Sequence, residues 1–330
     1  MMGLDDWSSC AEPRVLRARA AMLARIRAFF SEREVLEVET PLLSQAGATD
    51  PALASLCCHE ACGGSAPDGR ATLYLQTSPE FPMKRLLAGG VGSIYQICKV
   101  FRAGERGRLH HPEFTMLEWY RPGWTYQALM NELAELVRVV LERPALPVAS
   151  MGYRDLFTDH LGVDPWTSTV ADLRARAAEL GIADAERLDL DHDAWLDLLL
   201  SVGLEPRLGC DTMTFVIDYP PSQAALARVQ TRGEIAVAER FELYLDGIEL
   251  ANGFQELTDA AEQQARFIRD RERRQRRGLA AIPPDQRLLA ALSAGLPAAS
   301  GVAVGLDRLL MIGLGAQRID EVLAFPIERA

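Results

Sequence analysis

Charged and imidazole side chains are concentrated between two apolar segments near residue 100. The segment FRAGERGRLHHPEF contains Arg102, Glu105, Arg106, Arg108, His110 and His111. The flanking runs 94–101 and 114–120 have the composition of strands, so we expect a hairpin whose loop holds the charges. A guanidinium group can bind a phosphate or a carboxylate through two parallel hydrogen bonds. The loop therefore predicts a local site for one anionic ligand.

The composition limits what kind of ligand this is. The chain has 330 residues, 48% of them hydrophobic, and a formal net charge of −11. This acidity argues against nonspecific binding of nucleic acid, which depends on clustered Lys and Arg. The N-terminal residues have no apolar core of a signal peptide, and no apolar run is long enough to span a membrane. We therefore predict a cytoplasmic protein with no membrane partner.

Six cysteines in a chain of this length do not indicate a disulfide scaffold. Four potential metal ligands occur together in CCHEAC, namely Cys57, Cys58, His59 and Cys62. A structural zinc site normally needs a second ligand pair at a set spacing, and none follows nearby. We favour ordinary reduced thiols over a zinc site here.

The elements that would position the charged loop can be predicted from periodicity, caps and turn residues. We expect helices at 13–33, 80–88, 124–141, 167–180, 191–202, 261–277 and 286–294. We expect strands at 35–40, 74–77, 94–101, 114–120, 214–218, 240–245 and 248–254. Thr125 is a predicted N-cap, and Asp246-Gly247 predicts a hairpin turn. The charged helix 261–277 is expected to have a solvated face.

The order of these elements lacks regular alternation of strand and helix, so we predict an α+β fold with a mostly antiparallel sheet. The sequence contains neither GxxxxGK[ST] nor GxGxxG. A P-loop and a Rossmann fingerprint are therefore both excluded as nucleotide sites.

Three dispersed segments resemble motifs 1, 2 and 3 of class II aminoacyl-tRNA synthetases. They are VLEVETPLLS (35–44), FRAGE…HHPEFTMLEWY (101–120) and GVAVGLDRLL (301–310). With LQTSPEFPMKRLLAGG (75–90) and GIELANGFQELTDA (247–260), they resemble the catalytic domain of lysyl-tRNA synthetase. The resemblance implies the class II catalytic fold.

The resemblance begins near residue 14 and continues to the C-terminus. It implies a tail at 1–13, a catalytic domain at 14–330 with a helical insertion at about 143–210, and no anticodon-binding domain. A chain of this kind resembles the stand-alone paralogue family, the elongation factor P–(R)-β-lysine ligases. That family attaches its activated amino acid to a lysine of a protein, so no tRNA is expected as a partner.

The resemblance also implies which residues bind ATP. Arg102 and Arg308 are the expected catalytic residues, because adenylation requires cations where charge develops on the α-phosphate. The remaining implied ATP contacts are Glu105, His111, Glu249, Leu250 and Gly305. Two positions depart from the family pattern: the acid of motif 2 is displaced by one residue to Glu105, and His111 replaces an asparagine.

For the amino acid, the resemblance implies contacts from Ser78, Glu80, Tyr120 and Glu256. Carboxylates and hydroxyls are natural partners of ammonium groups. Ala303 stands where lysyl-tRNA synthetases tend to have glycine, and its additional methyl group can bias the pocket toward a differently placed amino group. The resemblance implies that the amino acid with this placement is β-lysine.

Glu249 and Glu256 are the implied Mg²⁺ ligands. A regular strand would place residues seven apart on opposite faces. We predict a bend or bulge at Gly253 that lets the two carboxylates converge. Mg²⁺ is typically bound by one or two carboxylates together with phosphate oxygens.

The predicted function is ATP-dependent activation of (R)-β-lysine, or lysine, and its transfer to a lysine ε-amino group of elongation factor P. Two alternatives remain: an amide ligase acting on a small amine, and a non-catalytic synthetase-like regulator. Motif 1 usually builds a dimer interface in this fold class, so we expect a homodimer. Arg19, which falls inside the apolar stripe of helix 13–33, would find its partner there.

Overall fold

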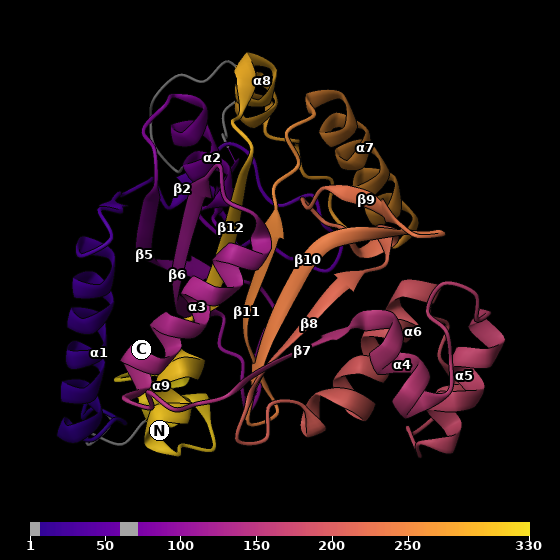
Figure 1. Cartoon of the computed structure of the whole chain (residues 1–330), viewed down its shortest axis with the longest axis horizontal. Helices are drawn as coiled ribbons and strands as arrows, with labels where there is room; N and C mark the ends of the chain where they lie inside the picture. Colours follow the sequence, from indigo (N-terminus) through magenta and orange to yellow (C-terminus); the bar gives the residue numbers. More distant parts are fainter. Residues whose placement is uncertain (1–6, 60–71) are drawn as a thin grey trace. The chain divides into compact units, whose positions relative to one another are not determined.

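The computed structural model describes residues 7–59 and 72–330 (Figure 1). The chain divides into two compact units. The first unit consists of Met1–Gly123, Thr258–Ala299 and Ala303–Ala330, and the second of Trp124–Leu257 and Ser300–Val302. Strand β12 (Ala299–Gly305) therefore contributes residues to both units.

The first unit contains two groups of strands and five helices in its described part. Its helices are α1 (Pro13–Ser31), α2 (Glu80–Ala88), α7 (Ala260–Arg276), α8 (Gln286–Gly295) and α9 (Leu306–Leu314). Its strands other than β12 are β1 (Leu36–Glu37), β2 (Leu43–Ser44), β3 (Cys57–His59), β4 (Thr72–Leu75), β5 (Ile94–Phe101) and β6 (Glu113–Pro122). Short 3₁₀ turns follow α9 at Ile319–Val322 and Ile327–Arg329.

Strands β5 and β6 form the predicted hairpin, visible in Figure 1 as neighbouring purple strands. Their register pairs Ile94 with Tyr120 and Phe101 with Glu113. Strand β1 pairs with β5 in parallel, and β2 and β3 each pair antiparallel with β4 in a separate small sheet. The charged segment between β5 and β6 is therefore held at both ends by a regular ladder.

Helix α1 packs its apolar stripe against this hairpin. Phe30 is fully buried, and its ring lies 4.4 Å from that of Tyr95 and 5.3 Å from that of Trp119, measured between centroids. The strand expected at 35–40 is limited to Leu36–Glu37. Backbone pairing continues only to Val38, whose N–H donates to the carbonyl oxygen of Tyr95, and Pro41 has no N–H with which to extend it.

Arg19 has its partner inside its own chain. Its Nη2 lies 2.5 Å from Oδ1 of Asp307 and donates to the carbonyl oxygen of Val322 at 2.9 Å. The prediction that a dimer interface would supply this partner is therefore wrong. Asp307 is only 1% exposed and also accepts the N–H of Thr115 at 2.6 Å, so one buried carboxylate joins α1, β6 and α9.

The second unit is built on an antiparallel core of strands with one parallel edge. The strand order is β11-β10-β8-β7, with β9 paired to β10 and β7 parallel to β8. The strands are β7 (Val148–Gly152), β8 (Met213–Tyr219), β9 (Val229–Arg232), β10 (Ile235–Leu245) and β11 (Ile248–Gln255). The predicted turn between β10 and β11 is confirmed, with φ of 52° at Asp246 and 71° at Gly247. Positive φ at both residues is the signature of a type I′ hairpin turn.

Four α-helices accompany these strands: α3 (Tyr126–Leu141), α4 (Tyr153–Leu161), α5 (Val170–Glu179) and α6 (His192–Leu199). Short π and 3₁₀ turns occur at Ala185–Arg187, Leu200–Leu204, Glu205–Arg207 and Pro221–Gln223. Within the segment predicted as a helical insertion, Phe157 and Trp195 are fully buried and share one apolar cluster with Tyr219 of β8. These helices are therefore fixed by packing against the strands of their own unit.

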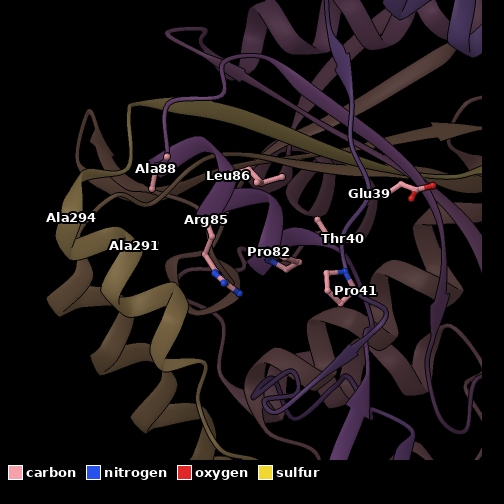
Figure 2. A pocket seen from close by; sticks show the side chains of 10 residues that line it. Glu39, Thr40, Pro41, Pro82, Arg85, Leu86, Ala88, Ala291 and Ala294 are labelled. Atoms are coloured by element: carbon pink, nitrogen blue, oxygen red, sulfur yellow. The ribbon is translucent and has the colours of Figure 1, made fainter.

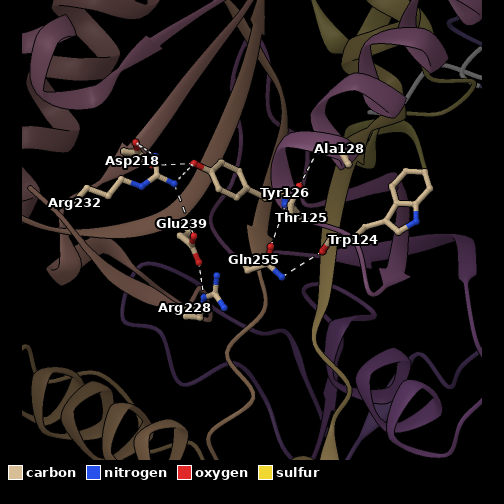
Figure 3. Close-up of polar contacts among 9 residues, drawn as sticks. All are labelled: Trp124, Thr125, Tyr126, Ala128, Asp218, Arg228, Arg232, Glu239 and Gln255. Carbon is tan, nitrogen blue, oxygen red and sulfur yellow. Dashed lines mark hydrogen bonds and ion pairs between the residues drawn. The ribbon is translucent and has the colours of Figure 1, made fainter.

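Helix α3 begins as predicted, with the Thr125 side chain accepting the N–H of Ala128 at 3.3 Å. Figure 3 shows how its first turn joins the strands. The Tyr126 hydroxyl contacts Asp218 of β8 at 3.0 Å and Arg232 of β9 at 2.7 Å, and the Tyr126 N–H donates to Gln255. This network ties three strands to one helix start.

The mostly antiparallel α+β fold is as predicted. Within the described residues, no helix has both the length and the apolar character needed to cross a membrane.

Candidate active site

A cluster of polar side chains lies in the first unit where β6 approaches the start of α2. Its centre is Glu118, which is 2% exposed. Oε2 of Glu118 accepts the Ser78 hydroxyl at 2.6 Å, and Oε1 accepts the Tyr120 hydroxyl at 2.5 Å. The Ser78 oxygen in turn accepts the backbone N–H of Glu80 at 3.0 Å. Three of the residues predicted to contact an amino acid are thus brought together around one carboxylate.

Glu118 itself was missed by the sequence analysis. The signal for it was available, because Tyr120 and Glu118 are two residues apart on one strand and so share a face. Burial and the neighbouring Glu80 carboxylate raise the pKa of Glu118 to about 7, against the opposing effects of the Ser78 and Tyr120 hydrogen bonds and the Lys84 charge. A buried carboxylate in such a setting can bind an ammonium group strongly, because its charge is poorly solvated without one.

Arg102 directly follows β5. Its side chain faces Glu105, the acid that lies one residue later than in the family pattern. Its Nη1 is 3.7 Å from Oε1 of Glu105, and its Nε donates to the carbonyl oxygen of Thr77 at 3.4 Å. Gly104 adopts a φ of +81°, which a residue with a side chain rarely does, and this turn brings Glu105 back toward Arg102. The guanidinium also lies 5.1 Å from the Phe114 ring centroid. The displaced acid therefore still pairs with the motif 2 arginine.

Arg308 lies in the first turn of α9 and reaches back to the same hairpin loop. Its Nε donates to the carbonyl oxygen of Leu109 at 3.2 Å, and its Nη2 is 2.8 Å from Nε2 of His110. Partial desolvation and the Arg308 charge lower the pKa of His110, which favours the neutral ring that can accept from a guanidinium. Gly305 is the N-cap of the same helix, so the cation stands at the end of α9 that attracts anions.

His111 is arranged differently from His110. It is 7% exposed, its Nδ1 lies 2.5 Å from the carbonyl oxygen of Glu113, and its Nε2 accepts the N–H of Ile327 at 2.9 Å. Both ring nitrogens therefore contact the backbone. Of the two adjacent histidines, His110 touches Arg308, and His111 anchors the loop to the C-terminal segment.

In the second unit, Glu249, Leu250 and Glu256 lie on or next to β11. Leu243 pairs with Ala251 and Tyr244 with Glu249, so Leu250 is an extra residue opposite β10. This bulge is between the two glutamates, at Leu250 and not at Gly253 as predicted. One extra residue reverses the alternation of faces. Glu249 therefore shares a face with Asn252 and Phe254, and the same alternation continued brings Glu256 onto that face.

Gly253 has a different role from the one predicted. A Cβ atom there would lie 2.3 Å from Cζ of Phe241 and 2.9 Å from the carbonyl oxygen of Gly301. The glycine is required by close packing of β11 against its neighbours and not by a bend. Leu250, the bulged residue, is 2% exposed.

Glu249 of β11 and Glu256, which directly follows this strand, are chemically suitable ligands for Mg²⁺. Glu256 is 2% exposed and Glu249 is partly buried. Mg²⁺ prefers oxygen ligands, typically one or two carboxylates completed by phosphate oxygens and water. Within the described residues, no group of three or more His, Cys, Asp and Glu side chains is placed to hold a metal by itself.

Two further features of the first unit lie apart from these residues. Cys57 and Cys58 are exposed free thiols on β3, and Cys62 of the CCHEAC cluster lies outside the described residues. A hollow of about 510 Å³ lies in the first unit between α2, α8 and the segment before β2 (Figure 2). Its lining consists of Glu39, Thr40, Pro41, Pro82, Arg85, Leu86, Ala88, Gly89, Ala291 and Ala294. None of the predicted site residues lines this hollow.

Comparison with known proteins places the chain in a family. The family model described as tRNA synthetases class II (D, K and N) matches residues 6–329. Curated proteins named elongation factor P–(R)-beta-lysine ligase from Salmonella arizonae and Salmonella dublin are each 48% identical over 324 residues. The aligned region covers 98% of this chain and 98% of each relative. The chain belongs to the class II tRNA synthetase family, within the group of elongation factor P–(R)-β-lysine ligases.

Proposed function

We propose that this protein activates (R)-β-lysine, or lysine, with ATP and transfers it to the ε-amino group of a lysine in elongation factor P. The name of the relatives that match 98% of the chain supports this acceptor and this amino acid. The structural observation that favours it most is the buried Glu118 carboxylate held between Ser78 and Tyr120. A substrate with a side-chain ammonium matches such a site.

In the first step, a carboxylate oxygen of the amino acid attacks the α-phosphorus of ATP and pyrophosphate leaves. Negative charge increases on the phosphoryl oxygens, and we assign Arg102 and Arg308 to oppose it. Glu105 orients Arg102, and His111 holds the loop in place through its backbone contacts. Leu250 and Gly305 are proposed nucleotide neighbours through their backbone.

Ammonium recognition is assigned to Ser78, Glu80, Tyr120 and Glu256, as the resemblance implies, with Glu118 added from the geometry. Ala303 is partly buried on β12, where its methyl group narrows the space that a glycine would leave. We propose that this methyl group biases the site toward the β-amino acid, by about 1–3 kcal/mol at most.

Glu249 and Glu256 are the proposed ligands of Mg²⁺, since the bulge at Leu250 lets both face the same side of β11. When bound, Mg²⁺ would neutralise phosphate charge and so assist departure of pyrophosphate. The two carboxylates would orient it.

In the second step, a neutral lysine ε-amine attacks the activated carbonyl carbon, AMP leaves, and the amine loses a proton. The proposed acceptor is a protein and not tRNA. Because elongation factor P takes part in translation, we place the reaction in the cytoplasm.

We also propose a homodimer built on the motif 1 region. Leu36, Leu42 and Leu43 are 53%, 38% and 45% exposed, and three exposed leucines within one short segment are consistent with a surface that a second subunit covers. Elution at monomer mass in size-exclusion chromatography with light scattering would overturn this part of the proposal.

The whole reaction is tested by a paired assay with purified elongation factor P. We expect ATP–pyrophosphate exchange that depends on (R)-β-lysine, and a mass increase of the acceptor protein equal to one lysyl residue. Exchange without labelling of the protein would instead favour an amide ligase for a small amine. Absence of exchange with every lysine isomer would favour a non-catalytic regulator.

A further inference from the structure

Lys84 is a buried lysine next to the proposed amino-acid site. Its side chain is only 2% exposed, and its Nζ lies 2.6 Å from Oε1 of Glu80, one turn earlier on α2. Removing an ammonium group from water is costly unless an acid compensates for it. An exposed position on α2 would have avoided this cost, as the neighbouring Arg85 does. The burial of Lys84 therefore calls for an explanation.

The surroundings of Glu118 suggest one. Glu80 and Lys84 of α2 act on Glu118 through their charges, and the Ser78 and Tyr120 hydroxyls act on it through hydrogen bonds. Cys98 of β5 is also nearby, and the Glu118 charge helps to raise the pKa of its thiol. Among them are two carboxylates and one ammonium. When both acids are ionised, their combined charge with Lys84 is −1.

We propose that Lys84 is a positioning residue whose ammonium is the internal counter-ion of the Glu80 and Glu118 carboxylates, leaving them with one net negative charge for one substrate ammonium. The inference rests on the proposed function, and it deepens the account of how that site selects a cationic amino acid. Lys84 fixes Glu80 through a direct ion pair and acts on Glu118 through space.

The consequence of removing Lys84 follows from electrostatics. Two neighbouring carboxylates without a cation cannot both ionise easily, so one retains a proton. A protonated acid attracts an ammonium group far less. Lys84→Met should therefore weaken amino-acid binding and move the acidic limb of the pH profile of kcat/KM to higher pH. Lys84→Arg should preserve the charge.

The first experiment measures ATP–pyrophosphate exchange against pH and amino-acid concentration. For Lys84→Met we expect the amino-acid KM at pH 7 to rise about tenfold or more, with the KM for ATP within about twofold. The acidic limb of kcat/KM should move upward by about one pH unit. Lys84→Arg should stay within about threefold of the wild type. Arg85→Met is the matched control, since it removes an exposed positive charge from the next position of α2.

An unchanged acidic limb and amino-acid KM in Lys84→Met would overturn the proposal. So would a parallel loss of kcat and ATP binding with a lowered melting temperature, which indicates a purely structural role. If Lys84→Met does not fold, Lys84→Gln is measured in its place, with the same expected shifts and the same overturning outcomes.

A second experiment does not depend on the reaction. The carboxyl group of Glu118 is followed by carbon-13 NMR in protein labelled at glutamate, with assignment by Glu118→Gln. Its titration midpoint should be higher in Lys84→Met than in the wild type by about one pH unit. Equal midpoints would overturn the role of Lys84 even in an active enzyme. If the wild type shows no exchange but the Glu118 midpoint is still higher in Lys84→Met than in the wild type, the proposed function alone is refuted and the role of Lys84 stands.

Discussion

Nη2 of Arg308 lies 2.8 Å from Nε2 of His110, so the α9 arginine is directed by the hairpin loop between β5 and β6. A second contact, from Arg308 Nε to the carbonyl oxygen of Leu109, fixes the same guanidinium. Motifs that are about 200 residues apart in the chain are thus joined within the first unit.

Replacing Arg308 should reduce catalysis without reducing the stability of the fold. We expect Arg308→Ala to lower ATP–pyrophosphate exchange by about 10²-fold or more, because a cation opposing the developing phosphate charge is lost. Its melting temperature should change little, since the side chain is partly exposed. Arg106→Ala is the control: its ion pair with Glu328 is 58% exposed at both partners, and exchange should remain normal. Near-normal exchange in Arg308→Ala would refute the assignment.

Replacement of Arg102 by lysine should impair catalysis, although it keeps the positive charge. The planar guanidinium contacts Glu105, the Thr77 carbonyl and the face of Phe114 together, and an ammonium cannot reproduce that arrangement. We expect Arg102→Lys to reduce kcat/KM for ATP by about 10²-fold, measured by exchange. Glu105→Gln should have a smaller effect, about tenfold, because it removes only the group that orients Arg102. A larger loss in Glu105→Gln than in Arg102→Lys would contradict this order.

The ionised carboxylate of Glu118, which is the form proposed to bind the substrate ammonium, should lower the free energy of unfolding. A raised folded-state pKa means that its contribution to stability is fully present below the ordinary value of 4.5 and is lost as pH rises through about 7. Glu118→Gln should therefore melt above the wild type at pH 8 and near it at pH 5, while losing amino-acid-dependent exchange. Glu113→Gln, at a 44% exposed position of β6, should show neither effect. A melting difference that is the same at both pH values would exclude a titrating Glu118.

The carboxylates of Glu249 and Glu256 should set the Mg²⁺ requirement. We expect Glu249→Gln to raise the Mg²⁺ concentration for half-maximal exchange by about tenfold, because one negatively charged oxygen ligand is lost. Glu234→Gln, at an exposed position between β9 and β10, is the control from the same unit. An unchanged Mg²⁺ dependence in Glu249→Gln would remove this residue from the proposed metal site.

Asp307 should be needed for folding more than for catalysis. Asp307→Ala leaves the Arg19 guanidinium without its carboxylate and the Thr115 N–H without its acceptor. Breaking a buried ion pair in this way costs about 3–5 kcal/mol, which urea unfolding would detect. The exposed pair of Arg318 and Asp320 offers a comparison: Asp320→Ala should cost below about 1 kcal/mol. Equal costs would show that Asp307 does not act as a buried counter-ion.

Much of the fold was predictable because its determinants are local. Helix α2 and strand β5 have the predicted bounds, since Pro79 and the apolar run 94–101 act on neighbouring residues only. The Thr125 cap and the Asp246-Gly247 turn formed for the same reason. Strand 35–40 was overpredicted, because pairing with β5 decides its length and a sequence pattern does not record where pairing ends.

The sequence by itself determined the α+β class, the order of the motifs and most of the residue types needed for adenylation. Tertiary structure decided which of those residues lie next to one another. The partner of Arg19 is 288 residues away at Asp307, and the bulge at Leu250 depends on the register with β10. Glu118 became central only because packing brought Ser78, just before α2, and Glu80 and Lys84 of α2 beside it. The charge of a buried site depends on every group that packing brings near it, and those groups are not neighbours in sequence.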